Sequence, residues 1–133
     1  MTRINVIPVH ELNQQMLCAE YREIARLPGN LKTWLNRKSK PADFCEIPNQ
    51  YVLGTGHVKY FFNKMRFLEN RFEQLVAEML HRGYKPNYRD SSIFKNCSIE
   101  FYNDYIPTEE AMEINRARIK ERLQKWLFIR KDV

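Results

Sequence analysis

Thr2 could act as a nucleophile through its backbone α-amine. The initiator methionine is normally removed when the second residue is small, so we expect the mature chain to begin at Thr2. An α-amine has a pKa of about 7.7–8.0, against about 10.4 for lysine, so more of it is neutral at physiological pH. A neutral amine can form a Schiff base with a carbonyl or an oxidised sugar carbon when partner groups lie within reach. An inert amino terminus is the ordinary alternative.

A carboxylate and two arginines follow at helical spacing. Arg22 and Arg26 are four residues apart and share one helix face, and Glu23 adjoins that face. A carboxylate between two guanidinium groups usually stays ionised and could stabilise a developing cation, while the arginines suit phosphates. An exposed helix face with an ordinary ion pair would show the same pattern. The spacing alone therefore leaves both interpretations open.

Four more residues could contact a polyanion. Arg118 and Arg122 are also four residues apart and could follow phosphates, or could lie on a solvated helix exterior. Trp126 lies in a tail of apolar and basic residues that could stack against bases or cap the core. His57 follows a two-glycine segment at a helix start, where backbone amides could meet a phosphate. That segment matches no nucleotide-binding motif, so a structural role for His57 is the alternative.

The spacing of potential metal ligands indicates no metal site. The three histidines are scattered, and so are Cys18, Cys45 and Cys97, which we expect to be free thiols in a reducing compartment. No apolar run approaches the length of a membrane span, and no secretion signal opens the sequence. We therefore expect a cytoplasmic protein without a membrane partner.

The spacing of apolar residues predicts that mostly helices position these residues. It predicts a helix over residues 11–27, broken or kinked at Pro28, with a short piece over 31–36. A continuous apolar stripe predicts one helix over residues 58–80 that ends at Gly83. A third helix is expected from Thr108, a plausible N-cap, to about residue 126. Residues 2–9 are expected to be extended and docked against the helices.

Length and charge fit one domain with a basic face. The 133 residues include 44% hydrophobic ones, enough for a single core over residues 1–133. The net charge of +6 divides into +4 for residues 1–40, −2 for residues 41–110 and +4 for residues 111–133. If the fold brings both ends together, the joint basic face suggests a polyanion partner. An ordinary soluble basic protein is the alternative.

These features together resemble the phage-type pyrimidine-dimer DNA glycosylases, also called ultraviolet-type endonuclease V. The shared motifs run in order along nearly the whole chain: Met1-Thr2-Arg3-Ile4-Asn5, Ala19-Glu20-Tyr21-Arg22-Glu23, Gly56-His57-Val58, Arg82-Gly83, Asp104-Tyr105-Ile106-Pro107 and Ala117-Arg118. The first two motifs are the most specific. Three departures concern lesion preference and affinity: Met16 stands where a better-known member has histidine, Pro28 alters the first helix, and the tail is shorter.

The resemblance implies a compact all-α fold of three main helices, with an extended amino-terminal segment threaded between them. It implies a DNA glycosylase with AP-lyase activity, in which the Thr2 amine attacks C1′ of the damaged nucleotide and Glu23 assists. It assigns DNA contacts to Arg3, Arg22, Arg26 and Arg118, and Arg122 stands where the family has a lysine, which keeps the charge. With His57 and Trp126, these residues make up the predicted DNA-binding set. The partner is damaged double-stranded DNA, and neither a metal nor another cofactor is implied. A monomer is expected because no self-complementary apolar patch is evident in the sequence.

Three alternatives stay open. The same machinery could act on another lesion, such as a ring-opened purine or a bare abasic site. The chain could also be a non-catalytic DNA-binding module, or an unrelated helical protein with a basic face.

Overall fold

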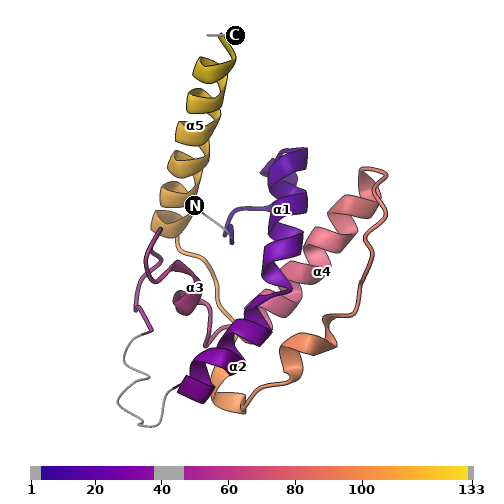
Figure 1. Cartoon of the computed structure of the whole chain (residues 1–133), viewed down its shortest axis with the longest axis vertical. Coiled ribbons are helices and arrows are strands. Elements are labelled where there is room, and N and C mark those ends of the chain that lie inside the picture. Colours follow the sequence, from indigo (N-terminus) through magenta and orange to yellow (C-terminus); the bar gives the residue numbers. More distant parts are fainter. Residues whose placement is uncertain (1–3, 38–46, 132–133) are drawn as a thin grey trace.

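The computed structural model describes residues 4–37 and 47–131, with side chains described as far as residue 125. These residues are helical, with short 3-10 turns and no strand among them, which confirms the all-α prediction (Figure 1). The helices are α1 (Gln14–Ile24), α2 (Leu27–Arg37), α3 (His57–Tyr60), α4 (Met65–His81) and α5 (Glu109–Lys131). The 3-10 turns are η1 (Val9–Glu11), η3 (Ser91–Lys95) and η4 (Ile99–Phe101). None of the described helices is long and apolar enough to cross a bilayer.

The first helical region breaks three residues earlier than predicted. Helix α1 begins after Asn13, whose side chain accepts the Met16 N–H at 2.8 Å, and it ends at Ile24. Pro28 explains the break, because it has no N–H for the Ile24 carbonyl and its ring would clash with that carbonyl. Helix α2 begins at Leu27, which places Pro28 in the first turn, where the missing N–H costs nothing.

The predicted helix over residues 58–80 is in fact two helices, α3 and α4. Tyr60, Phe61 and Phe62 are consecutive and all buried, so side chains that a helix points about 100° apart all meet the core at this place. The backbone N–H of Lys64 bonds to the Phe61 carbonyl, and Lys64 Nζ donates to the Tyr60 carbonyl at 2.8 Å. The lysine side chain thus satisfies the carbonyl that a continuous helix would pair with its backbone.

The carboxyl end of α4 follows the prediction. Gly83 adopts a left-handed φ of 91°, which favours glycine. The N–H of Tyr84 returns to the Met79 carbonyl at 2.8 Å, and the N–H of Gly83 bonds to Leu80. This pair of bonds is a Schellman motif, and it turns the chain away from the helix axis.

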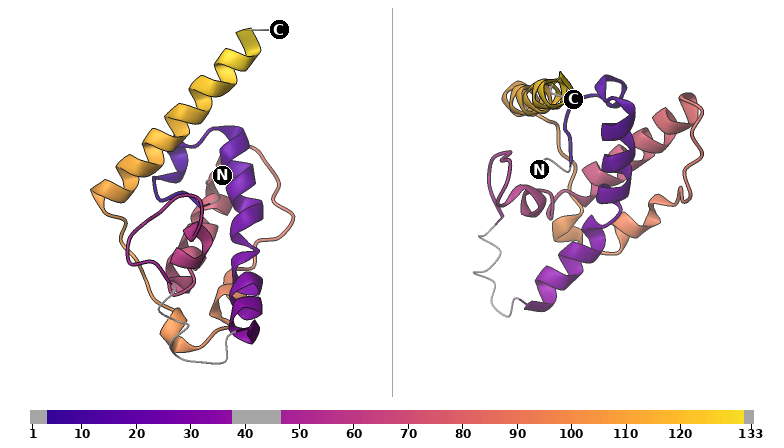
Figure 2. Two further views of the ribbon diagram at one scale, coloured as in Figure 1. Left: turned by 60° about the vertical axis from the view of Figure 1, so that its left-hand side comes forward. Right: turned by 45° about the horizontal axis from the view of Figure 1, so that its top comes forward.

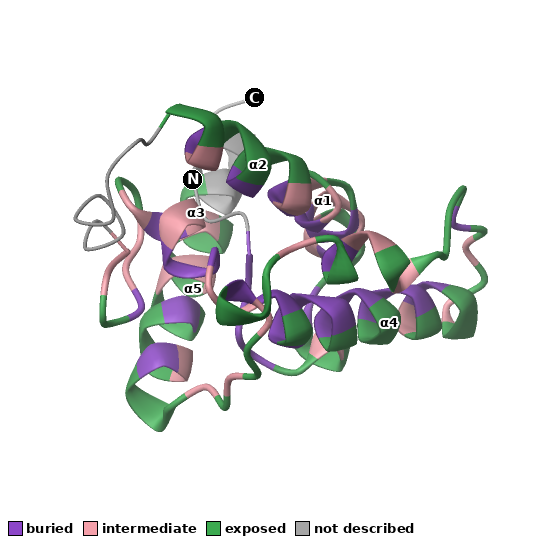
Figure 3. Ribbon diagram, turned by 90° about the horizontal axis from the view of Figure 1, so that it is seen from below, coloured by how far each residue is buried: buried purple, intermediate pink, exposed green. Residues whose placement is uncertain are grey.

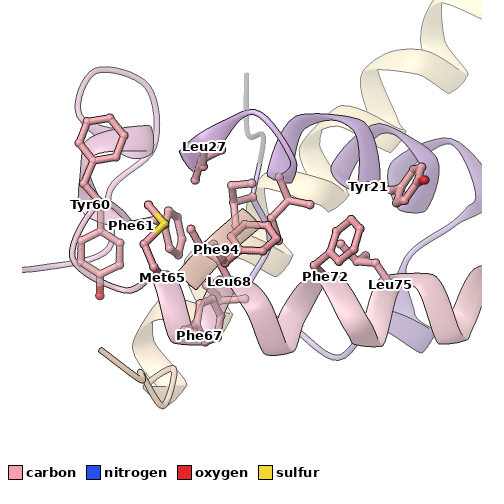
Figure 4. Packing of buried hydrophobic residues seen from close by; sticks show 14 of the residues in the cluster. Tyr21, Leu27, Tyr60, Phe61, Met65, Phe67, Leu68, Phe72, Leu75 and Phe94 are labelled. Carbon is pink, nitrogen blue, oxygen red and sulfur yellow. The ribbon is translucent and has the colours of Figure 1, made fainter. Parts of the chain in front are cut away.

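Helix α4 is the centre of the hydrophobic core. Its buried residues line one side and its exposed residues the other (Figure 3). Helix α1 packs along the buried side, where Tyr21 stacks on Phe72 at 5.8 Å between ring centroids (Figure 4). Phe94 of η3 is fully buried against the same helix. The face of α1 away from α4 is therefore left for a site.

Helix α5 and the amino-terminal segment complete the fold. The Thr108 hydroxyl caps α5 by accepting the Ala111 N–H at 3.0 Å, as predicted, and the helix runs to Lys131, beyond the predicted end. Its first turns contact the body of the protein, and the rest projects outward (Figure 2). Residues 4–7 are buried between α1 and α5, which confirms the threaded segment. The fold therefore has α1 and α5 on either side of the amino-terminal segment.

Candidate active site

A cleft of about 720 Å³ lies between α1 and α5. Its walls carry charged residues together with apolar ones such as Met16, Ile119 and Leu123. The charged residues on the walls are Arg22 and Glu23 from α1 and Arg118 and Arg122 from α5. Asn5 and Glu20 also line the cleft but are almost fully buried. The structure thus brings together one predicted carboxylate and three of the predicted arginines.

The predicted Arg26 reaches this cleft only through Glu23. Arg26 Nη1 lies 3.3 Å from Glu23 Oε1, and the Arg26 side chain is 68% exposed. Arg26 and Arg22 also line a smaller neighbouring hollow with Tyr21 and Tyr88, whose rings stack at 4.9 Å. The Glu23 carboxylate, 29% exposed, therefore lies at the point where the cleft meets the exposed face of α1.

Arg118 and Arg122 occupy the opposite wall at the spacing the sequence predicts. Arg118 Nη1 lies 3.5 Å from Glu121 Oε1, on the same helix. Its Nε atom is buried and has no hydrogen-bond partner within the described residues. Both arginines line the cleft that Glu23 also lines. This arrangement suits an anion, because positive charge on α5 and α1 converges on one space.

A chain of buried amides joins the two walls beneath the cleft. Asn5 Nδ2 donates to Glu20 Oε1 at 2.8 Å, and Asn115 Nδ2 donates to Asn5 Oδ1 at 2.8 Å. Asn115 Oδ1 accepts the Val6 N–H at 2.7 Å. Because Glu20 belongs to α1 and Asn115 to α5, Asn5 links the two helices. The width of the cleft is thereby tied to the amino-terminal segment.

Sequence reasoning did not single out the ion pair that neutralises Glu20. Arg71 of α4 donates to both Glu20 oxygens, at 2.7 and 3.0 Å, and also to the Ile7 carbonyl. Both side chains are almost fully buried. A buried carboxylate needs such pairing, since an isolated charge in the interior is very costly. The one signal in the sequence was Glu20 itself, which interrupts the apolar stripe of the first helix.

His57 lies inside the protein, at 2% exposure. Its Nε2 accepts the Ile4 N–H at 3.1 Å, and its Nδ1 lies 2.8 Å from the Val52 carbonyl. Both ring nitrogens are thus bonded to the protein backbone. The structure corrects the expectation that His57 contacts DNA, because the ring does not reach the surface.

The remaining predicted site residues lie outside the description. Thr2 and Arg3 precede the described residues, and the side chain of Trp126 lies beyond those described on α5. Within the described chain, Cys18 and Cys97 are free thiols. No group of three histidine, cysteine or acidic side chains in the same ranges could hold a metal ion.

The chain matches the model of one known protein family. The model, described as pyrimidine dimer DNA glycosylase, matches residues 1–92. The matched range contains α1 to α4, and with them Glu23, Arg22, Arg26 and the buried ion pair. It extends over more than half of the 133 residues and includes the α1 wall of the cleft and, from its floor, Asn5 and Glu20. The chain therefore belongs to the pyrimidine dimer DNA glycosylase family.

Proposed function

We propose that this DNA repair glycosylase also acts as an AP lyase, and that the Thr2 α-amine is its nucleophile at C1′ of a pyrimidine-dimer nucleotide. One observation carries the proposal: the segment leading to Thr2 is anchored in the floor of the cleft that Glu23 lines. Consecutive Cα atoms are 3.80 Å apart, so the Thr2 Cα lies within about 8 Å of the anchored Ile4 Cα. Asn5 lines the same cleft as Glu23 and the arginines, which supports an amine within reach of them on so short a tether.

The proposed reaction balances without a metal or redox partner. The neutral amine attacks C1′, and the bond from C1′ to the base breaks with its electron pair leaving on the base, which takes up a proton. The C1′–O4′ bond then opens, O4′ takes up a proton that the amine nitrogen gives up, and an imine forms between Thr2 and C1′. Loss of a C2′ proton expels the 3′ phosphate by β-elimination, and water hydrolyses the imine to release the enzyme.

Glu23 has two tasks in this scheme. As a carboxylate it stabilises the positive charge that develops at C1′ while the base departs. It also moves the protons that ring opening and elimination require, as general acid–base groups do. The Arg26 guanidinium at 3.3 Å orients the carboxylate from the side. The partly exposed position of Glu23 leaves it accessible to a nucleotide.

The cleft arginines grip the DNA backbone in this proposal. Arg22 holds phosphates on the α1 side, and Arg118 and Arg122 hold them on the α5 side. Arg3, Arg26 and Trp126 add contacts around the lesion. We propose that one copy of the chain, acting as a monomer and as one domain, carries all of these groups.

Borohydride trapping tests the proposal. The protein is incubated with duplexes that contain a thymine dimer, an abasic site or neither, with and without borohydride. We expect a covalent adduct with the first two duplexes, and strand cleavage without borohydride. Tight binding without any adduct would show a non-catalytic DNA-binding module. An adduct with the abasic duplex but not with the dimer-containing duplex would show that the enzyme acts on a lesion other than the pyrimidine dimer.

A further inference from the structure

We propose that His57 is a positioning residue for this reaction: its neutral ring holds the Ile4 N–H and thereby aims the residues that carry the Thr2 amine. The inference rests on the proposed function, because it concerns the placement of that amine. It also gives the Gly54-Thr55-Gly56-His57 segment a task other than binding a phosphate. Three observations and one kinetic argument support it.

The first observation is the protonation state that the ring must have. The Val52 carbonyl only accepts hydrogen bonds, so Nδ1, at 2.8 Å, carries the proton and donates it. The Ile4 N–H only donates, so Nε2, at 3.1 Å, must offer a lone pair. Only the neutral tautomer with hydrogen on Nδ1 satisfies both partners. In a protonated ring, Nε2–H and the Ile4 N–H would be two donors facing each other without an acceptor.

The second observation is that the ring cannot easily turn away. Tyr51 and Phe61 meet it edge-on, with ring centroids at 5.6 and 5.5 Å. Gly56, directly before it, has a φ of 88°, and a Cβ there would lie 3.3 Å from Pro48 Cγ. The His57 N–H bonds to the Gly54 carbonyl at 3.1 Å. The two-glycine turn therefore serves to aim the imidazole at the amino-terminal segment.

The third observation is the order of the anchors along the segment. Further along the segment, Asn115 accepts the Val6 N–H and Arg71 donates to the Ile7 carbonyl. The Tyr51 hydroxyl donates to the Ile4 carbonyl at 3.4 Å. Among the described residues, the bond to His57 is the anchor nearest in sequence to Thr2. Its loss frees the end that carries the amine while the later anchors remain.

The kinetic argument concerns what loss of the bond between His57 and the Ile4 N–H would do to the rate. A small displacement of a reacting group costs rate through lost orientation, and 1 Å of misplacement can cost about 10²-fold. His57 is buried and lies outside the lining of the cleft, so DNA affinity should not depend on it. A positioning role therefore predicts slower imine formation with unchanged binding.

Two isosteric variants test this. In His57→Gln the amide can present its oxygen near the position of Nε2, so it can still accept the Ile4 N–H. In His57→Asn the shorter amide stays near the position of Nδ1, so it keeps the Val52 bond and loses the bond to Ile4. The measurements are the single-turnover rate of borohydride trapping on an abasic duplex at saturating protein, the Kd for that duplex, and hydrogen exchange of the Ile4 amide.

We expect His57→Asn to trap about 10- to 100-fold more slowly, with Kd within about twofold of the unmodified protein and faster exchange at Ile4. His57→Gln should recover most of the rate. Trapping by His57→Asn at the unmodified rate would overturn the inference, and so would equal slowing by both variants. If His57→Asn does not fold, Tyr51→Phe removes the other Ile4 anchor and leaves the His57 bond in place. Trapping at the unmodified rate with constant Kd then supports the inference, and slowing by about 10-fold or more overturns it, because the His57 bond would not be enough to place the amine.

The controls separate this inference from the proposed function. Absence of an adduct with the unmodified protein overturns the proposed function, and the inference with it. An adduct with the unmodified protein, formed equally fast by His57→Asn, leaves the proposed function intact and overturns the role of His57 alone.

Discussion

At the scale of single residues, Glu23 differs from the other carboxylate of the cleft in what surrounds it. Glu20 is buried, paired with Arg71 and bonded to Asn5, so its oxygens are committed to the fold. Glu23 is partly exposed, and within the part of the chain that the structure describes its carboxylate pairs with the surface residue Arg26 at 3.3 Å. Two carboxylates three residues apart on one helix therefore have different tasks, one structural and one available to a substrate.

Glu23→Gln should bind dimer-containing duplex within a few-fold of the unmodified protein and lose base release by about 10²- to 10⁴-fold, since the amide neither stabilises a cation as well nor moves protons. Gel-shift titration and single-turnover base release measure the two effects. Glu20→Gln is unsuitable as a matched control for chemistry, because that residue supports the floor of the cleft. Unchanged turnover in Glu23→Gln would remove Glu23 from the mechanism.

Arg118→Ala and Arg122→Ala should each weaken binding to any duplex and reduce the slope of log Kd against log salt by about 1, as expected for a lost phosphate contact. Arg116→Ala is the matched control. It removes the same charge from the same helix, but Arg116 is paired with Glu11 at 2.8 and 2.9 Å and does not line the cleft. Equal salt slopes for all three variants would show that the charge acts without regard to its position.

At the scale of the elements, the amino-terminal segment depends on the buried ion pair between α1 and α4. Arg71 reaches Glu20 and the Ile7 carbonyl at once, so it holds the helices and the segment together. Removal of one member of a buried pair leaves the other charge unpaired, which costs about 3–5 kcal/mol. Loss of either member of this pair should therefore strongly destabilise the core.

Arg71→Met should lower the free energy of unfolding by about 3–5 kcal/mol in urea titrations. The double variant Glu20→Gln, Arg71→Met should recover much of this loss, because the glutamine carbonyl still accepts from Asn5 and no buried charge is left. The double variant therefore separates loss of a contact from exposure of a charge. If the losses of stability in Glu20→Gln and in Arg71→Met simply add up in the double variant, a direct pairing of the two residues is contradicted.

Lys64, at the junction of α3 and α4, gives a prediction for pH. Burial lowers the pKa of Lys64 from 10.5 to about 8, although the ammonium also donates to Tyr60 and Asn63. Because the folded pKa lies below the unfolded one, the unfolded chain binds more protons across this window, and the contribution of Lys64 to stability rises with pH.

The free energy of unfolding of the unmodified protein should therefore rise relative to that of Lys64→Met between about pH 7 and about pH 9.5. Urea titrations of both proteins at several pH values measure the difference. Burial also raises the pKa of Tyr51 and Tyr60, and this lowers the stability of the protein at higher pH. The Tyr51 contribution is the same in both proteins and therefore cancels in the difference. A difference that stays constant would show that Lys64 remains fully charged throughout.

The positions of the helices could be predicted from the sequence, but two of the breaks could not. Capping by Thr108 and termination at Gly83 are local, so the sequence predicts both. The break before Pro28 was placed too late, because the clash lies at the carbonyl four residues back. The break between α3 and α4 coincides with the burial of Tyr60, Phe61 and Phe62, which is a property of the packed core.

At the scale of the whole molecule, the division of charge along the chain becomes a spatial arrangement. The basic first block contributes Arg22 from α1, the basic last block contributes Arg118 and Arg122 from α5, and these residues line one cleft. The middle of the chain, with net charge −2, supplies α3 and α4 and most of the core. We expected basic residues from the two ends of the chain to share one face, and these three arginines do so by lining the cleft. Arg26 does not line the cleft but pairs with Glu23, which does.

The floor of the cleft could not be predicted in this way. The contacts between Asn5 and Asn115, or between Glu20 and Arg71, join residues more than fifty positions apart, and no local pattern specifies them. The same holds for the Ile4 bond to His57, a residue that the sequence suggested for a phosphate. Long-range polar pairing is decided by the packed fold, whereas periodicity and capping are decided by neighbours along the chain.

The identity of the trapped amine tests the account most directly. The protein is reacted with an abasic duplex and borohydride, digested, and the peptide that carries the adduct is identified by mass spectrometry. We expect the adduct on the Thr2 α-amine, and we expect a variant with one extra residue before Thr2 to form it far more slowly. An adduct on a lysine side chain, formed equally well by the extended variant, would contradict the assignment of Thr2 as the nucleophile.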